Sequence, residues 1–331
     1  MIKLRWLAPL FSRRYLLILL IFVGVIFLIH LFFLSPPSDF QNGLAVTVSE
    51  GSSIVEIATL LADKHLIRSP FVLEYLIRFA RLAGLSSNKT GVAVAGDYVF
   101  PRPENVVIIA RRLARGQYGI APIKLTIPEG ANSYDIAASL AQLIPTFDAT
   151  AFIAAAQPRE GYLFPNTYYF QSTWLPERMI GAMEKEFRAS TKSLAPLIAN
   201  SGRTLEQIVI MASLLEREAH TTEARQMIAG ILWQRLDAGM PLQVDATFAY
   251  ISDKNTFELS LKDLATSSPY NTYRYRGLPI GSIANPGLDA LTAALTPIKS
   301  DYWFYLSDQS GNLHYAVDFE EHKLNKARYL P

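Results

Sequence analysis

The sequence of 331 residues contains no cysteine. Disulfide bonds, thiolate catalysis and zinc sites with cysteine ligands are therefore excluded. The 5 histidines are scattered without an H-E-x-x-H pattern, and each is most simply a surface or packing residue. P-loop and dinucleotide-binding fingerprints are missing, and Ser213 does not lie in a G-x-S-x-G elbow. The sequence thus predicts no metal site and no cofactor.

A strong excess of charge of one sign is also missing. The formal net charge is +2, which does not suggest a nucleic-acid binder. Long hydrophobic runs are scarce as well, because only Tyr15–Leu34 approaches the roughly 20 apolar residues that span a bilayer as a helix. We therefore do not expect a protein with several membrane spans.

The single apolar run has the features of a membrane anchor. It follows a basic segment, residues 1–14, which contains no acid. It is longer than the core of a signal peptide, and it ends in Ser-Pro-Pro at 35–37 without a small-residue cleavage site. Because basic flanks stay in the cytoplasm, we expect a single-pass protein of the inner membrane with a cytoplasmic N-terminus. The body, from Ser35 onward, is then periplasmic or otherwise extracytoplasmic.

Two similar segments follow a short linker, residues 35–44. Residues 44–67 predict a strand, a Glu-Gly turn at 50–51 and an amphipathic helix. Residues 125–144 repeat this pattern 79 positions later, with a second Glu-Gly turn at 129–130. The sequence therefore predicts two related strand-helix units.

A further strand and helix are predicted between these two segments. The strand is Tyr98–Phe100, and the helix ends at Gly116. Together these small units resemble the peptidoglycan-binding LysM module. The first copy is either a glycan-binding module or a spacer without a ligand, and the pattern alone leaves both open.

An apolar helix ending near His220 is the most informative stretch. Thr204 is its expected N-cap, and Gln207 three residues later completes a capping-box pattern. Two acids, Glu216 and Glu218, stand close to its end. Residues two apart face different sides of a helix, so only one acid can point into a shared cleft.

The two acids differ in their neighbours. Glu218 shares its helix face with large apolar residues, whereas the face of Glu216 is smaller and more polar. An acid on an apolar stripe loses hydration, which raises its pKa and keeps it protonated near neutral pH, as a general acid requires. The alternative is a helix-end glutamate on a solvated face, paired with Arg217 or Arg225. The neighbours are Met211, Leu214 and Leu215 for Glu218, and Val209, Ala212 and Ser213 for Glu216.

Several polar and aromatic loops surround this helix in the sequence. Glu160–Phe170 combines aromatic rings, an amide and an acid, which suits a sugar-facing loop, with a core-packing turn as the alternative. Later loops at 268–273 and 277–287 are dense in proline, glycine, asparagine and tyrosine. A β-hairpin with its turn at 310–312 closes the chain.

Five of these motifs together resemble the endolytic murein transglycosylase family (MltG, YceG-like). In order, they are EGYLFPNTY, ASLLEREA, LQVDATFAY, SPYNTYRYRGLPIGSIANPG and the final hairpin, all behind one anchor. The resemblance implies a lyase that cuts peptidoglycan strands internally between N-acetylmuramic acid and N-acetylglucosamine, leaving a 1,6-anhydromuramyl end. Such an enzyme trims or terminates nascent strands. Two positions depart from the family pattern. After Glu218 the family usually has Thr or Ser, whereas this sequence has Ala219. After the aspartate of the LQ-x-D segment the family often has Pro, whereas this sequence has Ala246.

The resemblance also implies roles for individual residues. Its catalytic acid falls on Glu218, the residue that the burial argument selects independently. Glu218 would protonate the leaving oxygen and then accept the proton of the muramyl C6 hydroxyl, so no second catalytic carboxylate is needed, unlike in water-using glycosidases. Other polar residues are expected to bind substrate or support the cleft. They are Glu160, Gln243, Asp245, Asn271 and Tyr273.

The expected fold class is α+β, with a mixed α/β catalytic domain around the central apolar helix. The expected partners are peptidoglycan strands and the membrane, with peptidoglycan synthases as a further candidate and no nucleic acid. A membrane-anchored, peptidoglycan-binding scaffold without activity is the alternative, which Ala219 and Ala246 leave open. The expected parts are a cytoplasmic tail (1–14), a transmembrane helix (15–34), a linker (35–44), a LysM-like subdomain (45–121) and a catalytic domain (122–331).

Overall fold

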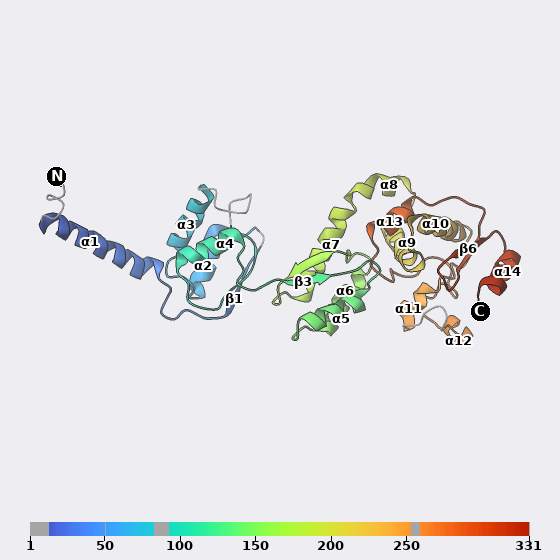
Figure 1. Cartoon of the computed structure of the whole chain (residues 1–331), viewed down its shortest axis with the longest axis horizontal. Helices are drawn as coiled ribbons and strands as arrows, with labels where there is room; N and C mark the ends of the chain where they lie inside the picture. The colour runs from blue at the N-terminus through green and yellow to red at the C-terminus, as the bar shows by residue number, and fades with distance from the viewer. Residues whose placement is uncertain (1–12, 50, 83–92, 253–258, 331) are drawn as a thin grey trace, which may run out of the picture. The chain divides into compact units, whose positions relative to one another are not determined.

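The computed structural model divides into two compact units (Figure 1). Unit 1 is Met1–Pro122 and unit 2 is Ile123–Pro331. Each unit has its own buried apolar side chains. Glu50, half of the first predicted Glu-Gly turn, lies outside the described residues. The described residues are 13–49, 51–82, 93–252 and 259–330.

Unit 1 contains the apolar segment followed by a small strand-helix body. Its strands β1 and β2 pair antiparallel, with Leu44 opposite Phe100. The predicted strands and helices are observed here, whereas α3 has no counterpart in the sequence-based expectation. The elements are α1 Arg13–Ile29, the π-helical turn η2 His30–Leu34, β1 Leu44–Val48, α2 Ile54–Asp63, α3 Pro70–Leu82, β2 Gly96–Phe100 and α4 Val106–Arg115.

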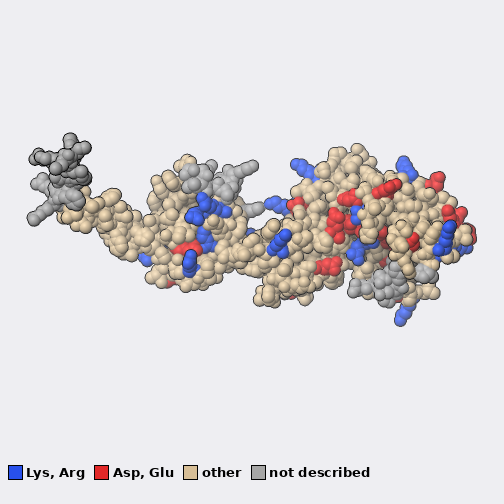
Figure 2. Space-filling model, viewed as in Figure 1, with Lys and Arg blue, Asp and Glu red and all other residues tan. Residues whose placement is uncertain are grey.

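α1 and η2 together form the apolar segment Tyr15–Leu34. This segment has 20 residues, a mean hydropathy of 3.2 and no part buried inside the structure. Figure 2 shows no charged side chain along it, although both units carry many. It is long and apolar enough to cross a membrane, and its position near the N-terminus also suits a signal sequence.

Local signals explain the helix ends of unit 1. α2 begins with a capping box, in which Ser53 and Glu56 each bond the backbone N–H of the other. α4 begins at the cap residue Asn105 and ends at Gly116, whose φ of +65° is the left-handed conformation that glycine favours. α2 and α4 then pack their apolar faces, together with α3, against β1 and β2.

Unit 2 contains the two remaining strand pairs of the described chain and most of its helices. β3 pairs antiparallel with β4, and β5 with β6. Its strands are β3 Ile123–Thr126, β4 Thr167–Phe170, β5 Phe304–Ser307 and β6 Leu313–Ala316. Its helices are α5 Ser133–Leu143, α6 Ala149–Ala156, η3 Gln157–Arg159, α7 Pro176–Ser190, η4 Lys192–Leu194, α8 Ala195–Asn200, α9 Leu205–Glu218, α10 Thr222–Asp237, α11 Ala246–Ser252, α12 Leu261–Leu264, α13 Leu288–Leu295 and α14 Phe319–Tyr329.

The sequence repeat is also a structural repeat. Ile57 and Ala58 in α2 are buried, and so are Ile136 and Ala137, which occupy the matching positions in α5. Both helices start with a capping box. Each therefore follows a strand and buries the same face.

α9 lies at the centre of a core that it shares with α10 and α13 (Figure 1). Its predicted capping box between Thr204 and Gln207 is observed. Every residue from Ile208 to Glu216 is buried. The predicted central apolar helix is thus confirmed, and its two ends are more exposed than its middle.

The predicted C-terminal hairpin is confirmed as β5 and β6. A helix that the sequence did not predict, α14, follows and packs on both strands. His322 of α14 is buried and stacks on Phe304, with ring centroids 5.1 Å apart. This contact fixes the hairpin against the rest of the C-terminal region.

Candidate functional site

Glu218 is the last residue of α9. Its side chain is partly exposed, whereas Met211, Leu214 and Leu215 on the preceding turns are fully buried. Loss of hydration, followed by the nearby charge of Asp245, raises the pKa of Glu218 to about 7. The C-terminal end of a helix also disfavours a negative charge. Near neutral pH a large fraction of molecules therefore holds a proton on Glu218.

Two groups from distant segments donate hydrogen bonds to the Glu218 carboxylate. The backbone N–H of Ala246, the first residue of α11, donates to Oε1 at 3.3 Å. The hydroxyl of Tyr305, in β5, donates to Oε2 at 3.1 Å. Ala246 stands where the resembled family often has proline, which has no N–H to donate. This departure adds a hydrogen bond to the carboxylate and leaves the acid in place.

Asp245 directly precedes Ala246, whose N–H donates to Glu218, and the charge of Asp245 raises the pKa of Glu218. The hydroxyl of Tyr273 donates a hydrogen bond to Asp245 Oδ1. Burial raises the pKa of Asp245, and burial together with the Asp245 charge raises the pKa of Tyr273. Tyr273 therefore remains a donor, and Asp245 is an oriented acceptor next to the acid.

Gln243 and Asn271 belong to the two loops that carry Asp245 and Tyr273. Gln243 has an exposed side chain and a left-handed backbone with φ +54°, and its N–H donates to Thr272 O at 3.1 Å. The amide of Asn271 is buried and makes four hydrogen bonds to backbone groups between residues 264 and 274. Asn271 therefore shapes its own loop, while the Gln243 side chain remains accessible.

Arg235 of α10, which the sequence did not single out, joins the segments around Glu218. It is 4% exposed, and its Nε donates to Trp303 O at 2.6 Å. Its Nη1 donates to Leu242 O at 2.8 Å. Trp303 precedes the strand of Tyr305, and Leu242 precedes the loop of Asp245. One guanidinium thus holds both segments at fixed positions.

Glu216 forms a buried ion pair on another side of α9. It is buried, and Arg225 Nη2 donates to its Oε1 at 2.5 Å. Arg225 Nη1 also reaches Asp289 Oδ2 at 2.5 Å, and the N–H of Gly287 donates to Glu216 Oε2 at 2.9 Å. Arg225 therefore pairs with Glu216 and not with Glu218. The reason is that α10 and α13 cover this side of α9.

Glu160 is buried in a second polar cluster of unit 2. Its Oε2 accepts from Ser133 N at 3.0 Å, and its Oε1 accepts from Asn285 Nδ2 at 2.7 Å. Burial raises the pKa of Glu160 to about 7. Asn285 also accepts from the N–H groups of Gly161 and Leu163, at 2.8 and 2.9 Å. The hydrogen bonds of Glu160 and Asn285 therefore connect the start of α5 with the EGYLF loop.

Gly161 lets this loop approach α9 closely. Its φ is +93°, and an added Cβ would lie 2.6 Å from Val209 of α9 and 2.3 Å from Ser282. A larger residue is therefore excluded at this position. The EGYLF loop is thus packed directly on the central helix.

Three tyrosines connect Glu160 with α11. The ring of Tyr250 lies 4.9 Å from that of Tyr270 and 6.4 Å from that of Tyr134. Burial, and then the charge of Glu160, raise the pKa of Tyr250. Tyr250 lies one helical turn beyond Ala246, the residue that donates to Glu218. The aromatic cluster is therefore adjacent to the segment that contacts the acid.

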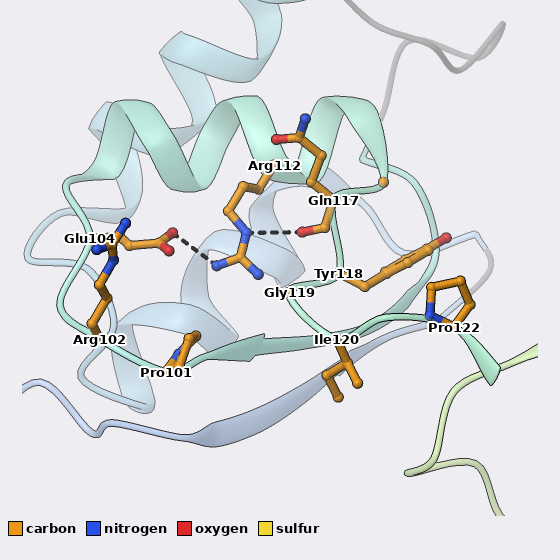
Figure 3. A pocket seen from close by; sticks show the side chains of 10 residues that line it. Pro101, Arg102, Glu104, Arg112, Gln117, Tyr118, Gly119, Ile120 and Pro122 are labelled. Carbon is orange, nitrogen blue, oxygen red and sulfur yellow. Dashed lines mark hydrogen bonds and ion pairs between the residues drawn. The ribbon is translucent and has the colours of Figure 1, made fainter. Parts of the chain in front are cut away.

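A separate hollow lies on the surface of unit 1, beside β2 and α4 (Figure 3). Arg112 points into it, but its Nε donates to Gln117 O and its Nη1 to Glu104, both at 2.9 Å. The guanidinium is thus engaged in holding the fold. The ring of Tyr118 also lines the hollow. None of the groups around Glu218 lies in this part of the chain.

The arrangement around Glu218 supports proton transfer by a single carboxyl group. No cluster of three or more potential metal ligands occurs within the described ranges. One carboxyl group with a pKa near 7 can donate a proton and accept one at the same pH. Two fixed donors, from Ala246 and Tyr305, stabilise its ionised form.

Comparisons with known proteins agree on one family. A family model described as the YceG-like family matches residues 46–328. The chain is 31% identical over 320 residues to an endolytic murein transglycosylase of Bacillus subtilis (strain 168), covering 88% of this chain and 86% of that protein. It is 29% identical to an endolytic murein transglycosylase of Streptococcus pneumoniae serotype 2 (strain D39 / NCTC 7466), covering 89% of this chain and 60% of that longer protein. A crystal structure of a yceG-like protein from Listeria monocytogenes aligns with a TM-score of 0.55 and 28% identity, covering 86% of this chain and 99% of that one.

Proposed function

The chain belongs to the YceG-like family, and we infer that it acts as its curated relatives are named, as an endolytic murein transglycosylase. The substrate is then the glycan strand of peptidoglycan. The reaction is a lyase reaction that cuts within the strand and leaves a 1,6-anhydromuramyl end. The family match extends over most of the chain beyond the apolar segment, so it includes all the residues around Glu218.

The environment of Glu218 carries the mechanism: its pKa is raised to about 7, and Ala246 N–H and the Tyr305 hydroxyl donate to its carboxyl oxygens. The proton of Glu218 passes to the glycosidic oxygen between the muramyl and glucosaminyl residues as the bond from that oxygen to muramyl C1 breaks. The carboxylate then accepts the proton of the muramyl C6 hydroxyl while the C6 oxygen bonds to C1. Glu218 thus donates one proton and accepts one, so it returns to its protonated form, and no water molecule takes part in the reaction. A pKa of about 7 suits a group that must serve first as acid and then as base.

The neighbours of Glu218 are assigned supporting roles. Asp245 helps to keep Glu218 protonated before the reaction, because its negative charge raises the pKa of Glu218. The hydroxyl of Tyr305 and the N–H of Ala246 stabilise the carboxylate that forms after proton transfer. Tyr273 orients Asp245 through its hydrogen bond. Asp245 therefore favours the protonated form of Glu218, whereas Tyr305 and Ala246 favour its ionised form.

The substrate-binding residues are proposed from their positions. Aromatic rings pack on the apolar faces of sugar rings, and Tyr250 lies close to the segment that contacts Glu218. Glu160 holds the start of α5, which carries Tyr134 of this cluster, because one of its oxygens accepts from Ser133 N–H and the other from Asn285. The exposed Gln243 is free to contact sugar hydroxyls, whereas the role of Asn271 is to hold its loop.

The membrane assignment is likewise a proposal. We propose that Tyr15–Leu34 is retained as a single transmembrane anchor with its N-terminus in the cytoplasm, so that the chain from Ser35 onward lies outside the inner membrane. The LysM-like subdomain is then the part of unit 1 from residue 45 to 121, and its hollow beside Tyr118 is a candidate glycan contact. Peptidoglycan synthases, which make the substrate at this membrane, are candidate partners.

Substitution of Glu218 tests the proposed activity. Glu218→Gln keeps the shape of the side chain but cannot supply the proton, so turnover should fall by about 10²–10⁴-fold. Its stability should hold, or rise above pH 7. The raised pKa of Glu218 contributes stability below its unfolded value of 4.5, and this contribution is lost as the pH rises through about 7.

The measurement is the release of 1,6-anhydromuropeptides from isolated glycan strands by the full-length protein. Chemical denaturation run in parallel shows whether the variant is folded. Wild-type protein that binds strands but releases no anhydro product would instead support the inactive scaffold. Product release by a folded Glu218→Gln variant would remove Glu218 from the mechanism.

A further inference from the structure

α3 of unit 1 exposes a row of large apolar side chains. Phe71, Tyr75, Phe79 and Leu82 are 74, 64, 55 and 87% exposed. Their spacing of four, four and three residues places them on one face of the helix. Single exposed apolar residues are common, but a contiguous row of four marks an interaction surface. We call these four residues the α3 stripe.

The stripe is distinct from the face by which α3 packs on its own unit. Leu73 and Ile77, one turn apart, are fully buried in the core of unit 1. Glu74 and Arg78 form an ion pair at 3.5 Å on the remaining side. α3 thus has a core face, a charged face and an exposed aromatic face. An exposed apolar face bordered by charged residues is typical of helices that lie in a membrane interface.

The start of α3 is held close to the end of the apolar segment. Arg68, two residues before α3, donates from Nε and Nη2 to Pro36 O at 3.2 and 3.1 Å. Pro36 is two residues beyond Leu34, the last residue of that segment. Two residues extend at most about 7 Å, so α3 begins within reach of the headgroup layer where the segment leaves the bilayer.

The linker is also fixed to unit 1 rather than free. Leu34 packs against the core of unit 1, and Phe40 is 9% exposed in the same core. Asp39 pairs with His65 at 2.7 Å. A unit attached in this way cannot move far from the membrane surface. Its exposed aromatic face has the lipid interface within reach, where aromatic residues are favoured.

We propose that the α3 stripe lies in the interface of the outer leaflet and docks unit 1 onto the lipid surface. The proposal rests on the proposed retention of Tyr15–Leu34 as an anchor. The apolar rings and Leu82 contact the acyl-chain boundary, and the Glu74–Arg78 side faces the headgroups. The protein is then attached to the membrane at two places, by the transmembrane segment Tyr15–Leu34 and by the interfacial helix α3.

A fluorescent label tests the depth of the stripe, because the chain contains no cysteine and one introduced cysteine is labelled alone. In the full-length protein, Tyr75→Cys carries the label on the stripe. Tyr169→Cys, on β4 of unit 2, is the control, since the two tyrosines are 64 and 61% exposed. Both proteins carry an NBD label and are placed in nanodiscs that hold one copy each and contain brominated lipids.

The label at Tyr75→Cys should show blue-shifted emission and strong quenching by the bromines, whereas the label at Tyr169→Cys should behave as in water. Adding Phe71→Ser and Phe79→Ser to the Tyr75→Cys protein should reduce the quenching to the control level. If Tyr75→Cys does not fold, Phe79→Cys replaces it, with the same expected result. Circular dichroism verifies folding.

Equal, water-like emission from both labels would overturn the proposal. Shielding of the Tyr75→Cys label from water only in discs that hold two copies would also overturn it, because the stripe would then be covered by a second copy of the protein and not by lipid. Protection in native membranes but not in lipid-only discs would identify a protein partner and would also overturn it. Lipid quenching does not depend on catalysis, so the outcome is independent of the test of Glu218.

Discussion

Glu218 and Tyr305 together determine how the proposed reaction responds to pH. The reaction begins with the protonated acid, so kcat/KM should fall about tenfold per pH unit above a pKa of about 7. Tyr305→Phe removes a donor that stabilises the carboxylate, so the descending limb should move to higher pH. The rate near pH 7 should drop roughly 10- to 100-fold, because a hydrogen bond to a charged group contributes about 1.5–3 kcal/mol.

Profiles of kcat/KM against pH for the two proteins provide the measurement. Tyr315→Phe is the matched control, because Tyr315 is the cross-strand partner of Tyr305 and stacks instead on Tyr302. Its profile should match that of the wild type. An unshifted limb in Tyr305→Phe would contradict the assigned contact with Glu218.

Tyr250 is the residue that most directly tests the proposed sugar platform. Tyr250→Ala removes the central ring of the aromatic cluster, which packs against both Tyr270 and Tyr134. KM for glycan strands should rise roughly 2- to 10-fold, since such ring contacts contribute about 0.5–1.5 kcal/mol, while kcat should change less. Steady-state kinetics measure both values, with Tyr169→Ala as the exposed control. A fall in kcat at constant KM would argue against substrate contact.

At the scale of the element, α9 has two acids with opposite roles. Glu216 joins α9 to α10 through Arg225 and to the start of α13 through Gly287. Glu216→Gln removes a buried charge from the pair with Arg225, so the free energy of unfolding should fall by about 1–3 kcal/mol. The activity of the folded fraction should survive. Glu218→Gln should show the reverse, with lost activity and retained stability.

Denaturant unfolding and activity per folded molecule, measured for both variants, separate these roles. Similar losses of activity in the two folded proteins would mean that the ion pair also positions the acid. Loss of activity in Glu216→Gln alone would mean that the catalytic acid of α9 is the buried one.

At the scale of the whole molecule, the linker is part of unit 1. Phe40 lies in its core, and Pro36 accepts two hydrogen bonds from Arg68. A fragment that starts at Ser35 should therefore be more stable than one that starts at Ala45. The difference in unfolding free energy of unit 1 should be at least about 2 kcal/mol, because burial of one large apolar side chain contributes about 1.5–3 kcal/mol. Urea unfolding of both fragments measures this difference. Equal stabilities would show that the linker contacts contribute nothing.

Local signals in the sequence determined much of the architecture. Thr204 and Gln207 mark the start of α9, and Gly116 marks the end of α4, because caps depend on residues only a few positions apart. The apolar segment and the C-terminal hairpin follow from short-range composition in the same way. The sequence also predicted that the pKa of Glu218 is raised, since the apolar residues on its own helix determine part of its burial.

The environment of the two acids was decided only by the tertiary structure. The smaller, more polar face that carries Glu216 is buried, and helical periodicity alone could not show that α10 and α13 cover it. Arg225 lies near both acids in the sequence, yet it pairs with Glu216. The packing of α10 and α13 on α9 determines that Arg225 pairs with Glu216.

The sequence by itself determined the capped, apolar helix that carries both acids, and the tertiary structure determined what surrounds each of them. Tyr305 stands 87 residues after Glu218, and Asn285 stands 125 residues after Glu160. Propensity and periodicity act over one or two helical turns, so they carry no information on such pairs. These contacts form because the burial of whole faces brings distant segments together, and Arg235 then holds two of those segments beside the acid.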